Sequence, residues 1–534
     1  MAAPSAATRR KLQRKFKLRG FTLKVDALEE AAAFLARFPD AEDDALDLLL
    51  DELDKEPLQS SILDRDAVRR VVALLVEADE AVDAASPAAT SARSALRVVD
   101  SFVVPRFHYD PIKKVFYEHT SRLAIHGEAG DKAALYRDRY QVLLQRLARD
   151  IYFSKPAFDT VMTEDDNCEI TSIQSLIGCT GRRWIMGVIS QLEERQFYLE
   201  DLTGACYAFL STKHKITSGF FVENTVIVAE GELLSNGIFQ VNTCGFPPLE
   251  DREASLSMLM GLDFFGGGVI PTEETVRLST LEKKAMNDMF VILSDVWLDN
   301  YETMEKLGVV LDGYDSLEAV PSLFVLMGNF CSRPCNLAFN SFEELRLQFG
   351  KLGEMIAARS RLKEHSRFLF IPGPDDAGPS KALPRCALPK YLTEELQKHI
   401  PNAIFVSNPC RVKFYTQEIV FFRQDLLYRM RRSCLIPPTT EETSDPFEHL
   451  VATITHQSHL CPLPLTVQPI IWSYDHCLRL YPTPHTIVLG DKSDQKAFKY
   501  TGITCFNPGS FANDSTFAAY RPCTKEVELS ALES

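Results

Sequence analysis

Five short apolar segments recur through the C-terminal half of the sequence, and each is followed by polar residues or glycine. The segments are 289–293, 323–327, 368–371, 403–406 and 486–489. A short run that is apolar at every position is typical of a strand buried on both faces of an α/β sheet. Helical patterns at 342–357 and 393–400 lie between the segments. The sequence therefore predicts an α/β domain over 259–534, with the loops that follow its strands gathered at one edge.

The polar residues at these strand ends are candidates for a ligand or metal site, because such sites lie at the carboxyl ends of strands in open α/β sheets. Asp295 directly follows the first strand. In many metallohydrolases the second ligand stands two residues later, but here that residue is Trp297, which cannot bind a metal. The corresponding positions at later strand ends are Asn329, Pro374, Asp375, Asp376 and Asp491. We expect a hydrolase scaffold from which the chemistry has been lost.

Five further strand patterns between 165 and 258 predict an OB-type β-barrel. They cover 184–189, 196–200, 204–210, 222–230 and 238–243. OB folds often bind single-stranded nucleic acid by stacking bases on aromatic side chains, and the barrel contains Trp184, Phe197, Tyr198 and Tyr207. The neighbouring residues Glu193, Glu194, Glu200 and Asp201 are acidic, so we expect the aromatic residues to serve packing and the barrel to be structural or protein-binding.

Residues 1–85 have helical patterns and an uneven distribution of charge. Residues 9–19 include seven basic side chains, and residues 40–54 include eight acidic and no basic ones. These charges fit either a solvated surface or a docking module for a partner, and the basic run also fits a nuclear localisation signal. Flexible chain is predicted over 81–100, and residues 86–164 as a whole are predicted to form a linker region. An extended aromatic segment over 103–111 and one helix over 131–150 belong to this region.

Composition limits the classes of function that remain. The 534-residue chain is long enough for two to four domains, and its formal net charge of −15 argues against a surface that grips DNA along its whole length. The thirteen cysteines have no repeating spacing, and the pair Cys331 and Cys335 is only a weak zinc signal, so free thiols in a reducing compartment are expected. We expect no transmembrane helix, no secretory signal, no membrane partner and no cofactor.

The strand-end residues together resemble the motifs of calcineurin-like metallophosphoesterases, whose active members hold two metal ions. Asp295 matches the first Asp of that family, Trp297 replaces the following His, and Asn329 replaces the Asp of a Gly-Asp motif. Pro374 and Asp375 replace the Asn and His of the next motif, and Asp491 stands near a later His motif. The resemblance implies an inactive phosphoesterase domain without a metal site. His456 and His459 are possible relics of the fourth motif.

An OB fold followed by an inactive phosphoesterase domain resembles the B subunits of eukaryotic replicative DNA polymerases, and within that family the epsilon type. The stretches that carry the resemblance include 136–140, 197–201, 262–267, 293–299 and 507–511. The resemblance implies a helical N-terminal bundle similar to the lid of AAA+ ATPases over 1–85, the linker region over 86–164, the OB fold over 165–258 and the phosphoesterase-like domain over 259–534.

The resemblance also implies a non-catalytic nuclear subunit. Its OB and phosphoesterase-like domains are expected to bind the C-terminal zinc domain of the polymerase catalytic subunit, and its N-terminal bundle the GINS part of the replicative helicase. Contact with DNA is expected only within the holoenzyme, and contact with the other small polymerase epsilon subunits only indirectly. Two alternatives remain open: a phosphodiesterase with an unusual metal set (Asp295, Asp375, Asp376, His456 and Asp491), and a single-stranded DNA binder that acts through the barrel.

Overall fold

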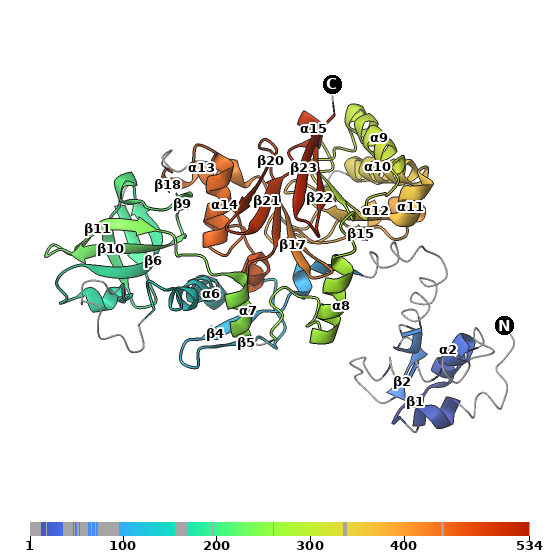
Figure 1. Cartoon of the computed structure of the whole chain (residues 1–534), viewed down its shortest axis with the longest axis horizontal. Helices are drawn as coiled ribbons and strands as arrows, with labels where there is room; N and C mark the ends of the chain where they lie inside the picture. The colour runs from blue at the N-terminus through green and yellow to red at the C-terminus, as the bar shows by residue number, and fades with distance from the viewer. Residues whose placement is uncertain are drawn as a thin grey trace. The chain divides into compact units, whose positions relative to one another are not determined.

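The computed structural model describes residues 12–17, 19–35, 46, 49–50, 53, 62–65, 67–69, 71–72, 95–154, 168–194, 196–259, 261–334, 339–438 and 443–532. The chain divides into two compact units, Met1–Ser91 and Ala92–Ser534. Each unit has a hydrophobic core of its own, and the two are described separately (Figure 1).

The first unit contains helix α2 (Val25–Leu35) and two short strands, β1 (Thr22–Leu23) and β2 (Ile62–Leu63). The strands pair in parallel. Leucine, alanine, valine and phenylalanine side chains form the core, including Leu12, Phe16, Ala31, Leu35, Leu49, Leu50 and Val68. The apolar stripe of α2 is buried as its helical spacing predicts, whereas the strand pair differs from the wholly helical expectation. Two-residue strands are too short to leave a recognisable pattern. Most of the acidic stretch 40–54, and residues 9–11 and 18 of the basic run, lie outside the described residues.

The first strand of the second unit is β3 (Leu96–Asp100). It pairs antiparallel with a strand more than 300 residues later in the chain. The prediction that these residues belong to a flexible linker is therefore wrong. The segment Leu-Arg-Val-Val-Asp contains two β-branched residues, which favour a strand. A hairpin of β4 (Phe107–Asp110) and β5 (Val115–Glu118) and the long helix α6 (Ala129–Leu147) follow.

A closed five-stranded barrel forms one end of the second unit (Figure 1). Its strands are β6 (Arg183–Glu193), β7 (Gln196–Glu200), β8 (Ala205–Phe209), β10 (Val226–Leu233) and β11 (Ile238–Gly245). They close in the order β10-β11-β8-β7-β6, with β8 and β11 parallel and the other pairs antiparallel. Ile185, Leu199, Ile227 and Phe239 fill its interior. This arrangement confirms the predicted OB-type barrel.

Two six-stranded sheets form the α/β part of the second unit. One has the order β15-β14-β13-β12-β22-β23 and the other the order β20-β21-β19-β17-β16-β3. The first sheet contains β12 (Phe290–Ser294), β13 (Leu323–Met327), β14 (Arg367–Ile371), β15 (Ile404–Phe405), β22 (Thr516–Arg521) and β23 (Glu526–Ala531). The second contains β16 (Cys410–Phe414), β17 (Gln417–Arg423), β19 (Thr486–Gly490), β20 (Lys496–Tyr500) and β21 (Ile503–Asn507), with β3 at its edge. The predicted α/β layers are present, but β19 belongs to a second sheet.

Apolar side chains from the two sheets pack against each other to form the central core. Phe290, Val325, Phe421 and Val488 are among its fully buried members. On the outer face of the first sheet lie α9 (Tyr301–Asp315), α10 (Phe339–Ala357), α11 (Ser360–His365) and α12 (Lys390–His399). On the outer face of the second lie α13 (Leu426–Arg432) and α14 (Pro446–His456). The result is a sandwich of two sheets with helices on both outer faces.

Helices α7 (Arg252–Leu259) and α8 (Thr272–Glu282) lie between the last strand of the barrel and β12 of the sandwich in the chain. The observed α6, α10 and α12 match the helices predicted near 131–150, 342–357 and 393–400. Among the described residues, none of the helices is both long enough and apolar enough to cross a membrane.

Candidate functional site

The carboxyl ends of β12, β13 and β19 meet around a single side chain, that of Arg423 at the end of β17. Arg423 is fully buried. Its Nη2 donates to Asp295 Oδ1 (2.7 Å), its Nε to the carbonyl oxygen of Gly328 (2.5 Å) and its Nη1 to the carbonyl oxygen of Gly490 (3.0 Å). Nη1 also donates to Asp425 Oδ1 (2.8 Å). A guanidinium therefore occupies the centre of the strand-end site that the sequence predicts.

The charge of Arg423 is stabilised although water is excluded. Burial by itself lowers the pKa of Arg423, but the carboxylates of Asp295 and Asp425 outweigh that effect and raise the pKa above its ordinary value. Burial also raises the pKa of Asp425, but Arg423 reverses this effect and lowers it. Arg423 and Asp425 therefore both remain ionised. The cation that these strand ends enclose is a side chain of the protein itself.

Asp295 is held by three donors at the end of β12. Besides Arg423, the backbone N–H of Asn329 donates to Asp295 Oδ1 (3.1 Å) and the hydroxyl of Ser510 donates to Oδ2 (3.1 Å). The backbone of Asp295 has a φ of 56°, a conformation that L-residues with a Cβ adopt only when their surroundings impose it. This carboxylate therefore serves as a buried anchor for Arg423.

Asn329 and Asp376 tie the loop after β13 to the loop after β14. Asp376 Oδ1 accepts from the N–H of Phe330 (2.7 Å) and Oδ2 from the N–H of Gly373 (2.7 Å), while Asn329 Oδ1 accepts from the N–H of Asp375 (2.9 Å). Burial raises the pKa of Asp376. A Cβ at Gly328 would overlap Asp376 Oδ2, so the close approach of the two loops requires a glycine there.

Asp491 and Pro374 also have hydrogen-bond partners, whereas the side chain of Trp297 has none in the described part of the chain. Asp491 Oδ2 accepts from the N–H groups of Leu426 (2.6 Å) and Leu427 (3.0 Å) and so caps α13. The carbonyl oxygen of Pro374 accepts from Arg385 Nη1 (2.5 Å). Trp297 is only half-buried, and its Nε1 has no hydrogen-bond partner among the described residues. Arg423, the side chain that fills the space between the strand ends, was not among the residues predicted from the sequence.

His456 and His459, the possible relics of a metal motif, bond elsewhere. His456 Nδ1 donates to the carbonyl oxygen of Pro247 (2.9 Å) and its Nε2 lies 2.8 Å from the Tyr500 hydroxyl. His459 Nε2 lies 3.2 Å from Asp475 Oδ1. Within the described part of the chain, no group of three or more His, Cys, Asp or Glu side chains is placed to hold a metal ion. The donor set of the phosphodiesterase alternative, all of whose residues are described, is therefore not assembled.

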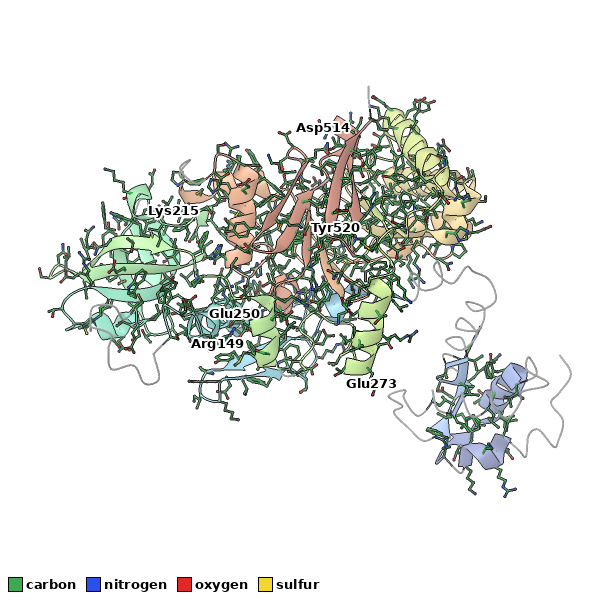
Figure 2. All side chains as sticks on the ribbon, viewed as in Figure 1. Arg149, Lys215, Glu250, Glu273, Asp514 and Tyr520 are labelled. Atoms are coloured by element: carbon green, nitrogen blue, oxygen red, sulfur yellow. The ribbon has the colours of Figure 1, made fainter. Side chains whose placement is uncertain are left out.

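The barrel is fixed to the sandwich by side chains and by the antiparallel pairing of β9 (Phe221–Val222), which precedes β10, with β18 (Cys434–Ile436), which follows α13. Gln457, directly after α14, accepts from the N–H of Val226 (2.7 Å) and donates to its carbonyl oxygen (2.8 Å). Within α14, Thr453 Oγ1 accepts from the N–H of Phe220 (2.8 Å). Arg149 and Glu250, labelled in Figure 2, form a two-pronged ion pair with distances of 2.7 and 2.9 Å. The barrel and sandwich therefore share one hydrogen-bonded junction.

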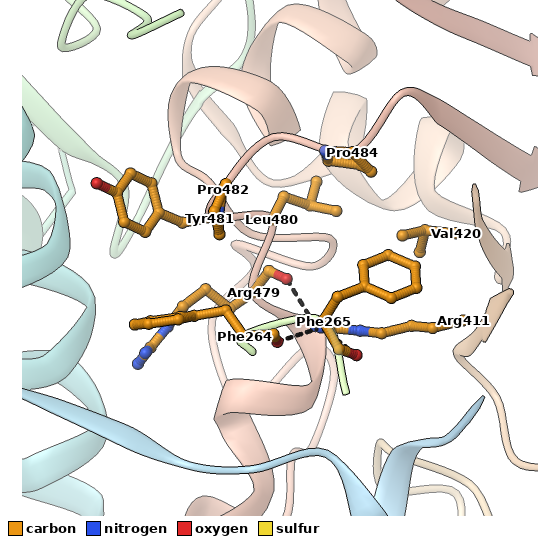
Figure 3. Close-up of a pocket in the computed structure, with 9 residues that line it drawn as sticks. All are labelled: Phe264, Phe265, Arg411, Val420, Arg479, Leu480, Tyr481, Pro482 and Pro484. Atoms are coloured by element: carbon orange, nitrogen blue, oxygen red, sulfur yellow. Dashed lines mark hydrogen bonds between the residues drawn. The ribbon is translucent and has the colours of Figure 1, made fainter. Parts of the chain in front are cut away.

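A second buried arginine organises the chain between barrel and sandwich. Arg411 donates through Nη1 to the carbonyl oxygens of Phe264 (2.8 Å) and Phe265 (3.2 Å), and through Nη2 to those of Cys477 (3.1 Å) and Arg479 (2.8 Å). Figure 3 shows Arg411 with Phe264, Phe265 and Arg479. Burial lowers the pKa of Arg411. The guanidinium thus replaces water as the partner of four carbonyl groups and fixes the glycine-rich turn at 262–268.

The aromatic residues of the barrel serve packing in part. Trp184 packs edge-on against Phe153 (ring centroids 5.4 Å apart), and Phe197 lies against the barrel core. Tyr198 and Tyr207 are half-buried and contact each other edge to face at 5.5 Å. Of the four aromatic residues considered for base stacking, Tyr198 and Tyr207 are the two that do not belong to a hydrophobic core of the described residues.

Comparison with known protein families finds matches for three stretches of the chain. Residues 290–499 match the family of DNA polymerase alpha/epsilon B subunits. Residues 129–248 match the OB-fold domain of DNA polymerase epsilon subunit 2-like proteins, and residues 5–74 match the N-terminal family of DNA polymerases epsilon. With the barrel and the sandwich, these matches define the class: a B subunit of a DNA polymerase.

Comparison with individual proteins is more specific. The DNA polymerase epsilon B subunit of Arabidopsis thaliana is 65% identical over 98% of this chain and 99% of that protein. DNA polymerase epsilon subunit 2 of Bos taurus is 36% identical over 97% of each chain, and that of Drosophila melanogaster 30% identical over 98% of each. The chain belongs to the family of DNA polymerase epsilon B subunits, whose members are accessory subunits and not the catalytic one.

Among solved structures, an archaeal phosphodiesterase aligns with 46% of this chain and 99% of its own length, at 11% identity and a TM-score of 0.24. This similarity is too low to support a conclusion about the α/β part.

Proposed function

We propose that this chain is a non-catalytic scaffold of the DNA polymerase epsilon complex in the nucleus. The single observation that carries the proposal is the position of Arg423, whose guanidinium takes the centre of the strand-end site and neutralises Asp295. The sandwich is then an inactive calcineurin-like phosphoesterase domain that has been kept for its surfaces. Two facts support this interpretation: the strand-end carboxylates have protein partners, and the chain belongs to an accessory-subunit family.

The second unit is proposed to bind the C-terminal zinc domain of the catalytic subunit through the barrel and the sandwich. The hydrogen-bonded junction at α14 supports this role, because a fixed arrangement of two domains offers a preformed composite surface to a partner. DNA would be contacted only within the holoenzyme, and the other small subunits only indirectly.

The first unit is proposed to be an AAA+ lid-like helical bundle that binds the GINS part of the replicative helicase. Its separate hydrophobic core supports an independent role, because a unit with its own core can dock without disturbing the rest of the chain. A tether between two docking units raises the effective concentration of each at its own site.

A binding experiment tests this division of labour. The two compact units, 1–91 and 92–534, are immobilised separately and exposed to the catalytic subunit's C-terminal domain and to GINS. We expect the first unit to retain GINS and the second to retain the zinc domain, with the full chain retaining both. Capture of both partners by one unit would refute the proposed division.

An activity assay tests whether the chain lacks phosphodiesterase activity. The full chain is incubated with Mn²⁺ and a generic phosphodiester, beside the Asp295→Ala variant. We expect no hydrolysis above background for either protein, because Arg423 occupies the centre of the site. Hydrolysis by the unsubstituted chain that Asp295→Ala abolishes would favour the phosphodiesterase alternative.

A further inference from the structure

A group of basic side chains surrounds the outer end of the Arg423 site, although the chain as a whole carries a net charge of −15. We call these basic side chains, together with one tyrosine, the α13 surface. It consists of Lys381, Tyr428, Arg429, Arg431, Arg432 and Lys492. Tyr428 is 69% exposed, and the side chains of Lys381 and Lys492 are 72% and 44% exposed. Arg431 and Arg432 are also exposed. Within the described part of the chain, neither of these two arginines has an ion-pair partner.

Hydrogen bonds hold Lys381, α13 and the residue before Lys492 together. Gln468 joins two of them, because its Oε1 accepts from Arg429 Nη1 and its Nε2 donates to the carbonyl oxygen of Lys381 (3.0 Å). Asp491, which precedes Lys492, accepts from the first N–H groups of α13. Lys381, α13 and Lys492 are therefore held side by side at the ends of the strands.

Two acidic residues of this region form ion pairs. Asp375 pairs with Lys381 (2.8 Å), and Asp425 pairs with buried Arg423 (2.8 Å) and with Lys492 (3.7 Å). Among the described residues, Asp494 is a further exposed carboxylate nearby in sequence. The positive charges of this surface that have no carboxylate partner in the described part of the chain therefore include those of Arg431 and Arg432.

We propose that the α13 surface binds the phosphate backbone of DNA. Exposed arginines and lysines contribute to such binding by displacing counterions from phosphates, and an exposed tyrosine between them offers a face on which an unpaired base can stack. The proposal rests on the proposed function, since it supplies the DNA contact expected of the subunit within the holoenzyme. It assigns this contact to the outer rim of the sandwich and not to the strands of the OB barrel.

Fluorescence anisotropy tests the proposal. The full chain is titrated into a labelled 30-nucleotide single strand and into the matching duplex, over a series of salt concentrations. The test variant is Arg431→Gln/Arg432→Gln/Lys492→Gln, which leaves the buried Arg423 and the Arg429 hydrogen bond unchanged. The control is Lys283→Gln/Lys284→Gln/Lys363→Gln, which removes three exposed charges near the opposite ends of β12 and β14. Circular dichroism melts confirm that both variants are folded.

We expect the test variant to bind at least about tenfold more weakly at low salt, and its plot of log affinity against log salt to be less steep by about 2. The control should stay within about twofold of the unsubstituted chain. Equal losses in both variants, no loss in either, or no binding by the unsubstituted chain would overturn the proposal. So would stronger competition by polyglutamate than by unlabelled DNA, which would assign the surface to an acidic protein segment.

Capture of the catalytic subunit's C-terminal domain by the same variants separates this proposal from the proposed function. Retained capture with lost DNA binding supports both. Lost capture by the unsubstituted chain would count against the scaffold function alone.

Discussion

Arg423 holds its charge in a position from which water is excluded. Four oxygen acceptors replace its hydration: two carboxylates and the carbonyl groups of Gly328 and Gly490. Removing one member of such a buried ion pair leaves the other charged and unpaired, which costs far more than the pair itself contributes. Arg423 and Asp295 should therefore behave as a coupled unit.

A double-mutant cycle measures this coupling. We expect Arg423→Met to lower the free energy of unfolding by about 3–5 kcal/mol, because Asp295 is left buried without its cation. Asp295→Asn alone should cost less, since Asp425 still pairs with Arg423. The double variant should be more stable than the sum of the two effects predicts, by more than about 1 kcal/mol. Urea-induced unfolding provides the measurement, and strict additivity would contradict the coupling.

Buried histidines give the stability of the second unit a pH dependence of known sign. Burial lowers the pKa of His456 and of His459 to about 4, and that of His476 and of His485 to about 3. Unfolded imidazoles titrate near pH 6.5, so below that pH the unfolded chain gains protons that the folded chain excludes. Their effect is to leave stability intact above pH 6.5 and to lower it as the pH falls toward 4.

Thermal or urea unfolding between pH 7 and pH 5 measures this effect before most carboxylates titrate. We expect each buried histidine to contribute a loss of about 2 kcal/mol between pH 6.5 and 5. The variant His459→Gln should therefore have a shallower pH dependence than the unsubstituted chain, whatever its stability at pH 7. Replacement of an exposed histidine, His365, is the control and should leave the slope unchanged. An identical slope in His459→Gln would contradict the assignment.

At the scale of elements, much of the strand and helix pattern could be predicted and the partners of the strands could not. The five strands of the barrel, α10 and α12 follow from periodicity because each has an unbroken apolar pattern of its own. β3 could not be assigned, since its partner β16 lies more than 300 residues away and local composition resembles linker. The same limit explains why β19 was assigned to the first sheet.

The motifs of metal sites do not include arginine, the residue type that lies between these strand ends. The strand 417–423 has an apolar run that ends in a charged residue, as the strand before Asp295 does. That pattern could have identified Arg423. The expected ligands of a metal site are carboxylates and imidazoles, however, so an arginine does not belong to a metal-binding motif. Asp295 directly follows β12 as the sequence predicts, whereas Arg423, the partner of its carboxylate, was not predicted.

The junction at α14 is an element-scale device that can be tested directly. Gln457→Leu removes both bonds to the backbone of Val226 and leaves a buried N–H and carbonyl without partners. We expect a loss of about 2–4 kcal/mol in the free energy of unfolding and faster hydrogen exchange at Val226. Gln397→Leu, at a partly exposed position in α12, should cost less than about 0.5 kcal/mol. Unchanged exchange at Val226 in the Gln457 variant would contradict the role of this side chain.

At the scale of the whole molecule, two compact units predict two unfolding transitions. The first unit has its core around Leu49 and Val68, and the second has its central core around Phe421 and Val488. Units with separate cores unfold separately unless a large apolar interface couples them. A local defect should therefore affect one transition and not the other.

Differential scanning calorimetry of the full chain tests this expectation. Leu49→Ala should destabilise the first unit by about 2–5 kcal/mol and shift only its transition, because the truncation leaves a cavity in a fully buried position. Leu369→Ala in β14 is the matched variant and should shift only the transition of the second unit. A single transition that both variants move together would show that the units unfold as one.

The cation at the strand ends is covalently part of the chain, and this changes how the fold depends on its surroundings. A bound metal ion leaves when it is diluted or taken up by a chelator, and the stability it confers varies with its free concentration. Arg423 cannot dissociate, so Asp295 keeps its partner at any ionic composition of the cell. The subunit thus carries its own permanent counterion, and its stability should be the same in EDTA as in millimolar divalent salts.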